Sequence, residues 1–239
     1  MKTGMNLLLW TTHVTEEHFP IIAKLKKAGF DGVEIPIFEG DVDHYRRLRK
    51  ELDNLGLGCT TVGNLREAAV ERFKRLLEWT ATLKGQIMAG PFHSPLGVFS
   101  GAGPTEEEKK RAADVLHQAA EIAKSAGVTL AIEYLNRFEC YFLTTAADTR
   151  ALVKRVNHPN FRMMYDTFHA NIEEKNIAET IASVVDSFVH VHISENDRGT
   201  PGTGHVQWDE TFRALRKAKY DNWLVIESFG RALPALAAA

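Results

Sequence analysis

The sequence predicts a (β/α)8 barrel, a closed ring of parallel strands surrounded by helices. Short apolar runs that are typical of buried strands alternate with longer segments that have helical periodicity. The alternation continues along all 239 residues without a linker or a change of composition, and barrels of this size commonly form one domain. We therefore expect one domain over residues 1–239. An open doubly wound sheet shows the same alternation, so it is the alternative fold.

Eight short apolar segments are the expected strands. They lie at residues 7–10, 32–35, 59–62, 86–90, 129–133, 162–166, 188–193 and 223–227. Strands of a parallel barrel are buried on both faces, because side chains fill the interior and helices cover the outside. This burial explains why the segments are mainly apolar.

The segments between the strands carry the start and stop signals of helices. Pro20 lies near the start of the first helix and Gly29 just beyond its end, while Gly56 ends the second helix. Thr105 and Glu108 have the spacing of a capping box. The expected helices span residues 15–28, 43–55, 66–83, 105–126, 145–156, 176–185 and 209–218, and residues 230–239 leave room only for a shortened last helix.

The composition excludes several classes of protein. Hydrophobic residues make up 44% of the chain and charged residues 25%, which is ordinary for a globular protein. The net charge of -2 offers no broad basic field for nucleic acid or an anionic membrane. No apolar run has the length of a membrane span or a signal peptide, and the only cysteines are Cys59 and Cys140. We therefore expect a cytoplasmic enzyme without a disulfide framework.

Polar residues stand at the C-terminal ends of four successive expected strands: Glu133, Asp166, His192 and Glu227. These strand ends meet at the mouth of a barrel, where active sites lie. Each residue alone is more often a solvated loop residue than a functional one, but their equivalent positions indicate a shared site. The carboxylates would repel one another unless a cation neutralised them, and this donor set suits Mn²⁺, Mg²⁺ or Co²⁺. His190 points to the same side as His192 but lies farther from the strand end, so we expect it to be a packed residue or to support a ligand.

Further polar residues follow these strands in segments that we interpret as loops, at 134–139, 167–174 and 194–202. The last of these is rich in Gly and Pro, but no Gly-Lys-Ser/Thr follows it, so it is not a phosphate loop. His93 and Trp208 are additional candidates for the pocket wall, although a local turn contact and helix packing explain them equally well.

The segments around these residues resemble a known family. The motifs are Glu-Tyr-Leu-Asn-Arg-Phe-Glu at 133–139, Asp-Thr-Phe-His-Ala-Asn-Ile-Glu-Glu at 166–174, the segment 192–198 and Ile-Glu at 226–227. They resemble the D-tagatose, D-allulose and L-ribulose 3-epimerases, which are ketose 3-epimerases of the xylose-isomerase-like barrel superfamily. The resemblance covers nearly the whole chain and implies a homo-oligomer, either a dimer or a tetramer.

The resemblance also implies roles for individual residues. Glu133, Asp166, His192 and Glu227 would bind one divalent metal, with Mn²⁺ the first choice and Co²⁺ or Mg²⁺ as alternatives. Glu133 and Glu227 would be the catalytic pair that acts on opposite faces of C3. The residues that orient the ketose substrate would be Glu139, His169 and Arg198.

The implied reaction is the interconversion of C3 epimers of free ketohexoses or ketopentoses through an enediolate. Inversion needs two acid/base groups, because a single base would tend to restore the original stereocentre. The nearest alternative is a hydroxypyruvate or aldose–ketose isomerase with the same metal site. A metal-dependent DNA-repair nuclease on a related barrel is a second alternative, and the charge balance argues against it. A non-catalytic sugar-binding protein is the third.

Overall fold

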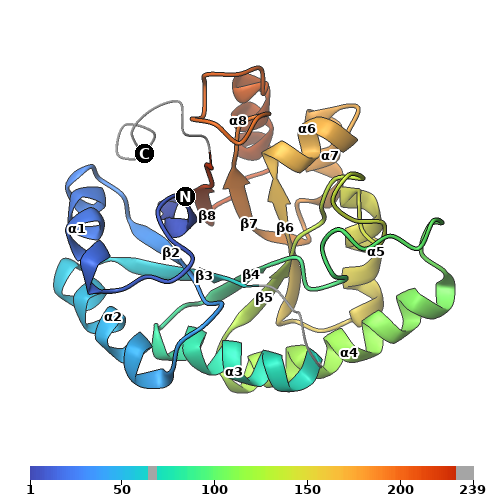
Figure 1. Ribbon diagram of the computed structural model, residues 1–239. Coiled ribbons are helices and arrows are strands. Elements are labelled where there is room, and N and C mark those ends of the chain that lie inside the picture. The colour runs from blue at the N-terminus through green and yellow to red at the C-terminus, as the bar shows by residue number, and fades with distance from the viewer. Residues whose placement is uncertain (64–68, 230–239) are drawn as a thin grey trace.

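The structure is a computed structural model that describes residues 1–63 and 69–229. It confirms the predicted barrel: eight parallel strands pair in chain order, and β8 pairs with β1 to close the ring. Helices surround the strands (Figure 1). The strands are β1 (Lys2–Asn6), β2 (Gly32–Pro36), β3 (Gly58–Val62), β4 (Ile87–Gly90), β5 (Thr129–Ile132), β6 (Phe161–Asp166), β7 (Phe188–Ile193) and β8 (Trp223–Ile226).

The helices largely follow the predicted segments. They are α1 (Phe19–Lys27), α2 (Val42–Leu55), α3 (Ala69–Thr82), α4 (Glu106–Ser125), α5 (Ala146–Val156), α6 (Thr167–Glu173), α7 (Ile177–Val184) and α8 (Trp208–Lys217), with short 3-10 turns η1 (Leu7–Leu9) and η2 (Glu16–His18). The capping box of α4 is present, since Thr105 Oγ1 accepts the Glu108 N–H at 3.2 Å and Glu108 accepts the Thr105 N–H at 2.7 Å. The start of the expected third helix, at 66–68, and the expected short last helix at 230–239 lie outside the described residues.

The prediction for the first strand was wrong. β1 spans Lys2–Asn6, and the apolar run that follows forms η1. The Asn6 side chain accepts the Leu8 N–H at 2.9 Å and so ends the strand. The position of β1 is set by pairing with both neighbouring strands, through Gly4 with Gly32 on one side and with Val225 on the other. A local measure of hydrophobicity cannot report these pairings.

The loop predicted at residues 167–174 was also wrong, because α6 occupies most of it. Asp166 is the N-cap of this helix, and its Oδ1 accepts the Phe168 N–H at 2.7 Å. The helix has only seven residues, which is too short for a clear periodic pattern. It begins directly at the end of β6 and so holds His169 one turn from Asp166.

The barrel interior changes from apolar to polar toward the C-terminal strand ends. The part of the interior farther from the C-terminal strand ends, called the lower part here, is filled by a separate apolar cluster. Its members are Ile87, Ala89, Ala131, Met164, Trp223 and Val225. The Trp223 ring needs glycine opposite it, since a Cβ on Gly32 would lie 2.6 Å from Trp223 Cη2. Above this cluster, Asn6, Glu34 and Thr60 of β1, β2 and β3 stand in one row of the strand register. The main core lies outside the strands, where helix residues such as Leu25, Leu52 and Phe73 are buried.

The end of β4 depends on Gly90. Its φ of +140° is rarely adopted by residues with a side chain, and a Cβ there would lie 2.2 Å from the Gly63 carbonyl oxygen. The Gly90 carbonyl oxygen accepts the Glu133 N–H at 2.9 Å. This glycine therefore fixes both the path after β4 and the backbone position of Glu133.

A buried carboxylate organises the long segment between β7 and α8. Glu195 is inaccessible to solvent, and it accepts the N–H groups of Val206 at 2.9 Å and Gly202 at 2.8 Å and the Trp208 Nε1–H at 2.9 Å. Burial by itself would raise the pKa of Glu195, but these N–H donors hold it below its ordinary value. Trp208 thus serves as a packing partner of this segment.

Among the described residues, no helix combines the length and the apolar character that crossing a membrane would require.

We expect Gly90→Ala to lower the free energy of unfolding by roughly 2 to 5 kcal/mol, because it adds both backbone strain and a steric clash. Urea denaturation measures this loss. Gly103→Ala is the control, since a Cβ at Gly103 would meet open space; it should change stability by no more than about 0.5 kcal/mol. Equal stabilities of the two variants would contradict the strain assigned to Gly90.

We expect the stability lost in Glu195→Gln to depend on pH. The folded pKa of Glu195 is depressed, so its stabilisation is complete above the unfolded pKa of about 4.3 and is lost as pH falls through the folded value. The difference in unfolding free energy between wild type and variant should therefore be largest near pH 7 and shrink toward pH 3. The exposed Glu78 on α3 provides the control, Glu78→Gln. A difference for Glu195→Gln that stays constant with pH would refute this assignment.

Candidate metal and catalytic site

The four residues predicted as metal ligands meet at the mouth of the barrel. Glu133, Asp166, His192 and Glu227 each offer one ligand atom, and these atoms all lie within 4.8 Å of one another. None of the four residues is more than 5% exposed. The structure therefore brings together, from β5 to β8, the side chains that the strand-end pattern singled out.

Backbone contacts between neighbouring strands position these side chains. The Glu133 N–H donates to the Gly90 carbonyl at 2.9 Å, and the Glu227 N–H donates to the Ile193 carbonyl at 3.0 Å. Asp166 stands opposite His192 in the register of β6 and β7. Because the N-terminus of α6 uses Asp166 Oδ1, the other oxygen, Oδ2, is free to face the cluster.

The electrostatics of the cluster reflect crowded negative charge. Burial, together with the charge of Glu227, raises the pKa of Glu133 well above its ordinary value. Burial by itself would also raise the pKa of Asp166, but the Arg198 guanidinium holds it below its ordinary value. Burial would lower the pKa of His192, but the carboxylates of Glu227 and Glu34 raise it well above its ordinary value. The surroundings thus stabilise the charged form of Asp166 and disfavour that of Glu133.

The donor set fits a divalent cation. Asp166 Oδ2 and His192 Nδ1 are buried and make no hydrogen bond within residues 1–63 and 69–229. They lie 3.8 Å apart, and His192 Nδ1 is 3.5 Å from Glu227 Oε1. Buried polar atoms need a partner, and carboxylate oxygens with one imidazole nitrogen suit Mn²⁺, Mg²⁺ or Co²⁺.

The residues predicted to orient substrate surround this cluster. His169 Nε2 lies 3.6 Å from Glu133 Oε1 and 2.9 Å from Arg198 Nη2. Glu139 is half-buried beside them, and its Oε1 accepts a hydrogen bond from Asn136 Nδ2 at 2.8 Å. Asn136 in turn donates its backbone N–H to His169 Nδ1 at 3.0 Å. Glu139 therefore reaches the cluster through Asn136 and His169.

Arg198 is held in an unusual backbone conformation. Its φ is +61°, in the left-handed region that residues with a side chain adopt at some cost. Its carbonyl oxygen accepts the Phe229 N–H at 2.7 Å, and its guanidinium lies 4.2 Å from the centre of the Phe168 ring. The guanidinium donates to Glu227 and lies 3.5 Å from Asp166 Oδ2. These contacts fix a positive charge at the edge of the cluster.

Sequence reasoning missed Glu34. This residue is fully buried on β2, and its Oε2 lies 2.7 Å from His192 Nε2. His190 Nε2 lies 2.9 Å from Glu34 Oε1. Burial would raise the pKa of Glu34, but the two histidines hold it below its ordinary value. A glutamate within the apolar run Gly-Val-Glu-Ile-Pro at 32–36 was the available signal, and it was overlooked because Glu34 lies in the middle of its strand.

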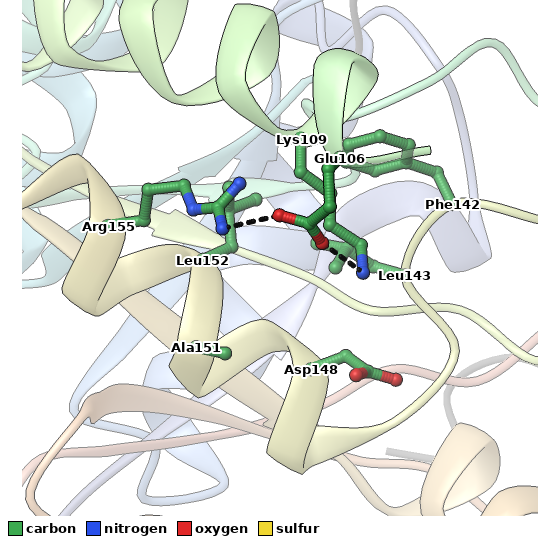
Figure 2. Close-up of a pocket in the computed structure, with 8 residues that line it drawn as sticks. All are labelled: Glu106, Lys109, Phe142, Leu143, Asp148, Ala151, Leu152 and Arg155. Atoms are coloured by element: carbon green, nitrogen blue, oxygen red, sulfur yellow. Dashed lines mark hydrogen bonds and ion pairs between the residues drawn. The ribbon is translucent and has the colours of Figure 1, made fainter. Parts of the chain in front are cut away.

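A separate cavity lies between α4 and α5 (Figure 2). Glu106 crosses it and binds Arg155 at 2.8 Å and Lys109 at 3.2 Å. Apolar side chains such as Leu143 and Leu152 make up much of its remaining wall. Two carboxylates, Glu106 and Asp148, line this cavity, and Glu106 is paired with these cations. The cavity therefore does not reproduce the cluster at the mouth of the barrel.

Comparisons with known proteins agree with this geometry. The chain matches the xylose isomerase-like TIM barrel family over residues 22–239. It is 32% identical to a ketose 3-epimerase of Arthrobacter globiformis, over 98% of this chain and 86% of that protein. It is also 32% identical to a D-psicose 3-epimerase of Agrobacterium fabrum, over 96% of this chain and 85% of that protein.

A solved structure shows the same likeness in three dimensions. The D-psicose 3-epimerase of Clostridium cellulolyticum, whose crystal structure was determined with D-tagatose, superposes with a TM-score of 0.86 at 26% identity, over 100% of this chain and 88% of that one. The resemblance to ketose 3-epimerases stated from the motifs is thus confirmed. The chain belongs to the xylose isomerase-like TIM barrel family, and its relatives over nearly the whole length include several ketose 3-epimerases.

Proposed function

We propose that this protein is a metal-dependent ketose 3-epimerase that interconverts C3 epimers of free ketohexoses or ketopentoses. The observation that carries the proposal is the buried cluster of Glu133, Asp166, His192 and Glu227, whose ligand atoms lie within 4.8 Å of one another. The epimerases among its relatives support the same reaction class. We further propose Mn²⁺ as the metal, with Co²⁺ or Mg²⁺ as alternatives.

A hydrogen on carbon next to a carbonyl is too weakly acidic to leave unaided. When bound, a divalent cation would supply Lewis-acid stabilisation of the negative charge that develops on the sugar oxygens. In the proposed reaction, Glu133 and Glu227 exchange the C3 proton on opposite faces of the substrate. They follow β5 and β8, the two outer strands of the four that supply the cluster, and this placement supports the division of roles.

The contacts of His169 support a role in binding a substrate oxygen. Nδ1 accepts the Asn136 N–H, so the neutral ring carries its proton on Nε2. Burial lowers the pKa of His169, which favours this neutral form. Nε2 and Arg198 Nη2, only 2.9 Å apart, are then both donors, and an acceptor oxygen placed between them would satisfy both. A hydroxyl or carbonyl oxygen of the sugar provides such an acceptor.

We expect Glu133→Gln and Glu227→Gln each to lower kcat by about 10²–10⁴-fold, because each removes one acid/base group. The assay uses D-fructose, D-tagatose and L-ribulose with saturating Mn²⁺, and chromatography identifies the products. In D2O, wild type should place deuterium at C3 of the epimeric product. Glu106→Gln changes a glutamate outside the cluster and should retain activity. Normal turnover by either cluster variant would refute its role, and an aldose product would identify the alternative isomerase.

We expect chelation to abolish activity and added Mn²⁺ to restore it. Cation binding to the folded state should also raise the melting temperature through mass action, by an amount that grows with metal concentration. Differential scanning calorimetry of the chelated protein, with and without Mn²⁺, measures this shift without any substrate. Full activity after exhaustive chelation, checked by elemental analysis, would be incompatible with a metal-dependent reaction.

A further inference from the structure

We propose that Glu34 is a positioning residue that orients His192 toward the metal and, through Asn6, steadies Glu227. The inference rests on the proposed function, since it assigns a supporting role within the same site. Glu34 lies on β2, across the barrel from His192 on β7. Neither the strand-end pattern nor the family motifs of the sequence included it.

The contact with Glu34 fixes the orientation of the His192 ring. Glu34 Oε2 lies 2.7 Å from His192 Nε2, and an ionised carboxylate can only accept, so Nε2 donates. In the neutral ring, which is the form that binds a metal, a proton on Nε2 leaves Nδ1 with its lone pair. Nδ1 is the atom that faces Asp166 at 3.8 Å and Glu227 at 3.5 Å. A carboxylate that binds the far nitrogen of a ligating histidine fixes its tautomer and increases its basicity.

The Glu34 carboxylate is itself held firmly. Asn6 Nδ2 donates to Oε2 at 2.9 Å, and Thr60 Oγ1 donates to Oε1 at 2.9 Å. Both donors stand in the same register row as Glu34 on the neighbouring strands. Since Glu34, Asn6 and Thr60 are at most 1% exposed, these contacts do not compete with bulk water.

Asn6 connects Glu34 to Glu227, which is one of the two proposed catalytic residues. Its Nδ2 also lies 3.4 Å from Glu227 Oε1. One amide group thus links the carboxylate that orients His192 to the carboxylate that would exchange the C3 proton. A loosened Glu34 would therefore affect both a metal ligand and a member of the catalytic pair.

Glu34, His190 and His192 also have the spacing of a second group of metal ligands. The hydrogen bonds from Asn6 and Thr60 already use both Glu34 oxygens, so a second cation would have to compete with them. The contacts therefore favour a positioning role for Glu34, with a single bound metal.

The test compares Mn²⁺ binding to the chelated wild type and to Glu34→Gln by isothermal titration calorimetry. Gln keeps the shape of Glu34 but removes its charge and half of its acceptors. We expect one Mn²⁺ per chain in both proteins and a 10- to 100-fold weaker affinity in the variant, the range typical of such supporting residues. Circular dichroism and a thermal melt establish that the variant is folded.

Glu121→Gln is the matched control. Glu121 Oε1 lies 3.1 Å from His158 Nε2, so this variant also changes a glutamate that contacts a histidine. Glu121 belongs to α4, on the outside of the barrel and away from the cluster. Its Mn²⁺ affinity should equal that of wild type. If Glu34→Gln does not fold, Thr60→Val tests the positioning role instead. This substitution keeps the side-chain shape and removes one hydrogen bond to Glu34. It should weaken Mn²⁺ binding roughly 2- to 10-fold.

Each outcome has a distinct meaning. If wild type binds Mn²⁺ and Glu34→Gln binds it equally well, the positioning role is refuted while the proposed function stands. Binding of two Mn²⁺ ions by wild type and one by Glu34→Gln would overturn the inference in favour of a second metal site. If wild type binds no divalent cation, the proposed function fails and the positioning role fails with it.

Discussion

The crowding of carboxylates at the barrel mouth is the constraint on which the rest of this structure depends. Glu133, Asp166 and Glu227 are buried within a few ångströms of one another, and Glu34 lies just below them. Like charges in a low-dielectric interior are costly unless they are paired or hydrogen-bonded. The positive charge of Arg198, the His192 ring and the amide of Asn6 all lie where they reduce that cost.

The strands and the segments that follow them contribute different residues to the candidate site. The strands and the residues directly after them place the side chains of the cluster, and the parallel ladder pairs Asp166 with His192. The segments after β5 and β7 bring Glu139 and Arg198 over the mouth, and each is stabilised by its own polar contacts. The hydrogen bonds of Glu195 and Asn136 show how irregular backbone is held in place where no sheet supports it. The candidate site thus combines side chains set on a rigid sheet with polar groups from hydrogen-bonded loops.

The side chains inside the barrel also differ along its axis, from apolar at one end to polar near the mouth. Trp223 and its apolar neighbours fill the lower part, where close packing supports the fold. The polar row of Asn6, Glu34 and Thr60 lies above them and replaces apolar packing with hydrogen bonds. Such a row is stable in the interior because its members hydrogen-bond to one another. It lies next to the cluster, since Asn6 Nδ2 is 3.4 Å from Glu227 Oε1.

The sequence by itself determined the barrel, most of its helices and the four residues of the cluster. Alternating strand and helix patterns are local signals, and strand-end residues in a parallel barrel must converge at one mouth. The tertiary structure alone decided where β1 lies, because two neighbouring strands select that segment by pairing. It alone revealed Glu34 too, since residues 158 positions apart, Glu34 and His192, meet only when the barrel closes. The short α6 depends likewise on the Asp166 cap at the end of β6, and seven residues are too few for periodicity to disclose a helix.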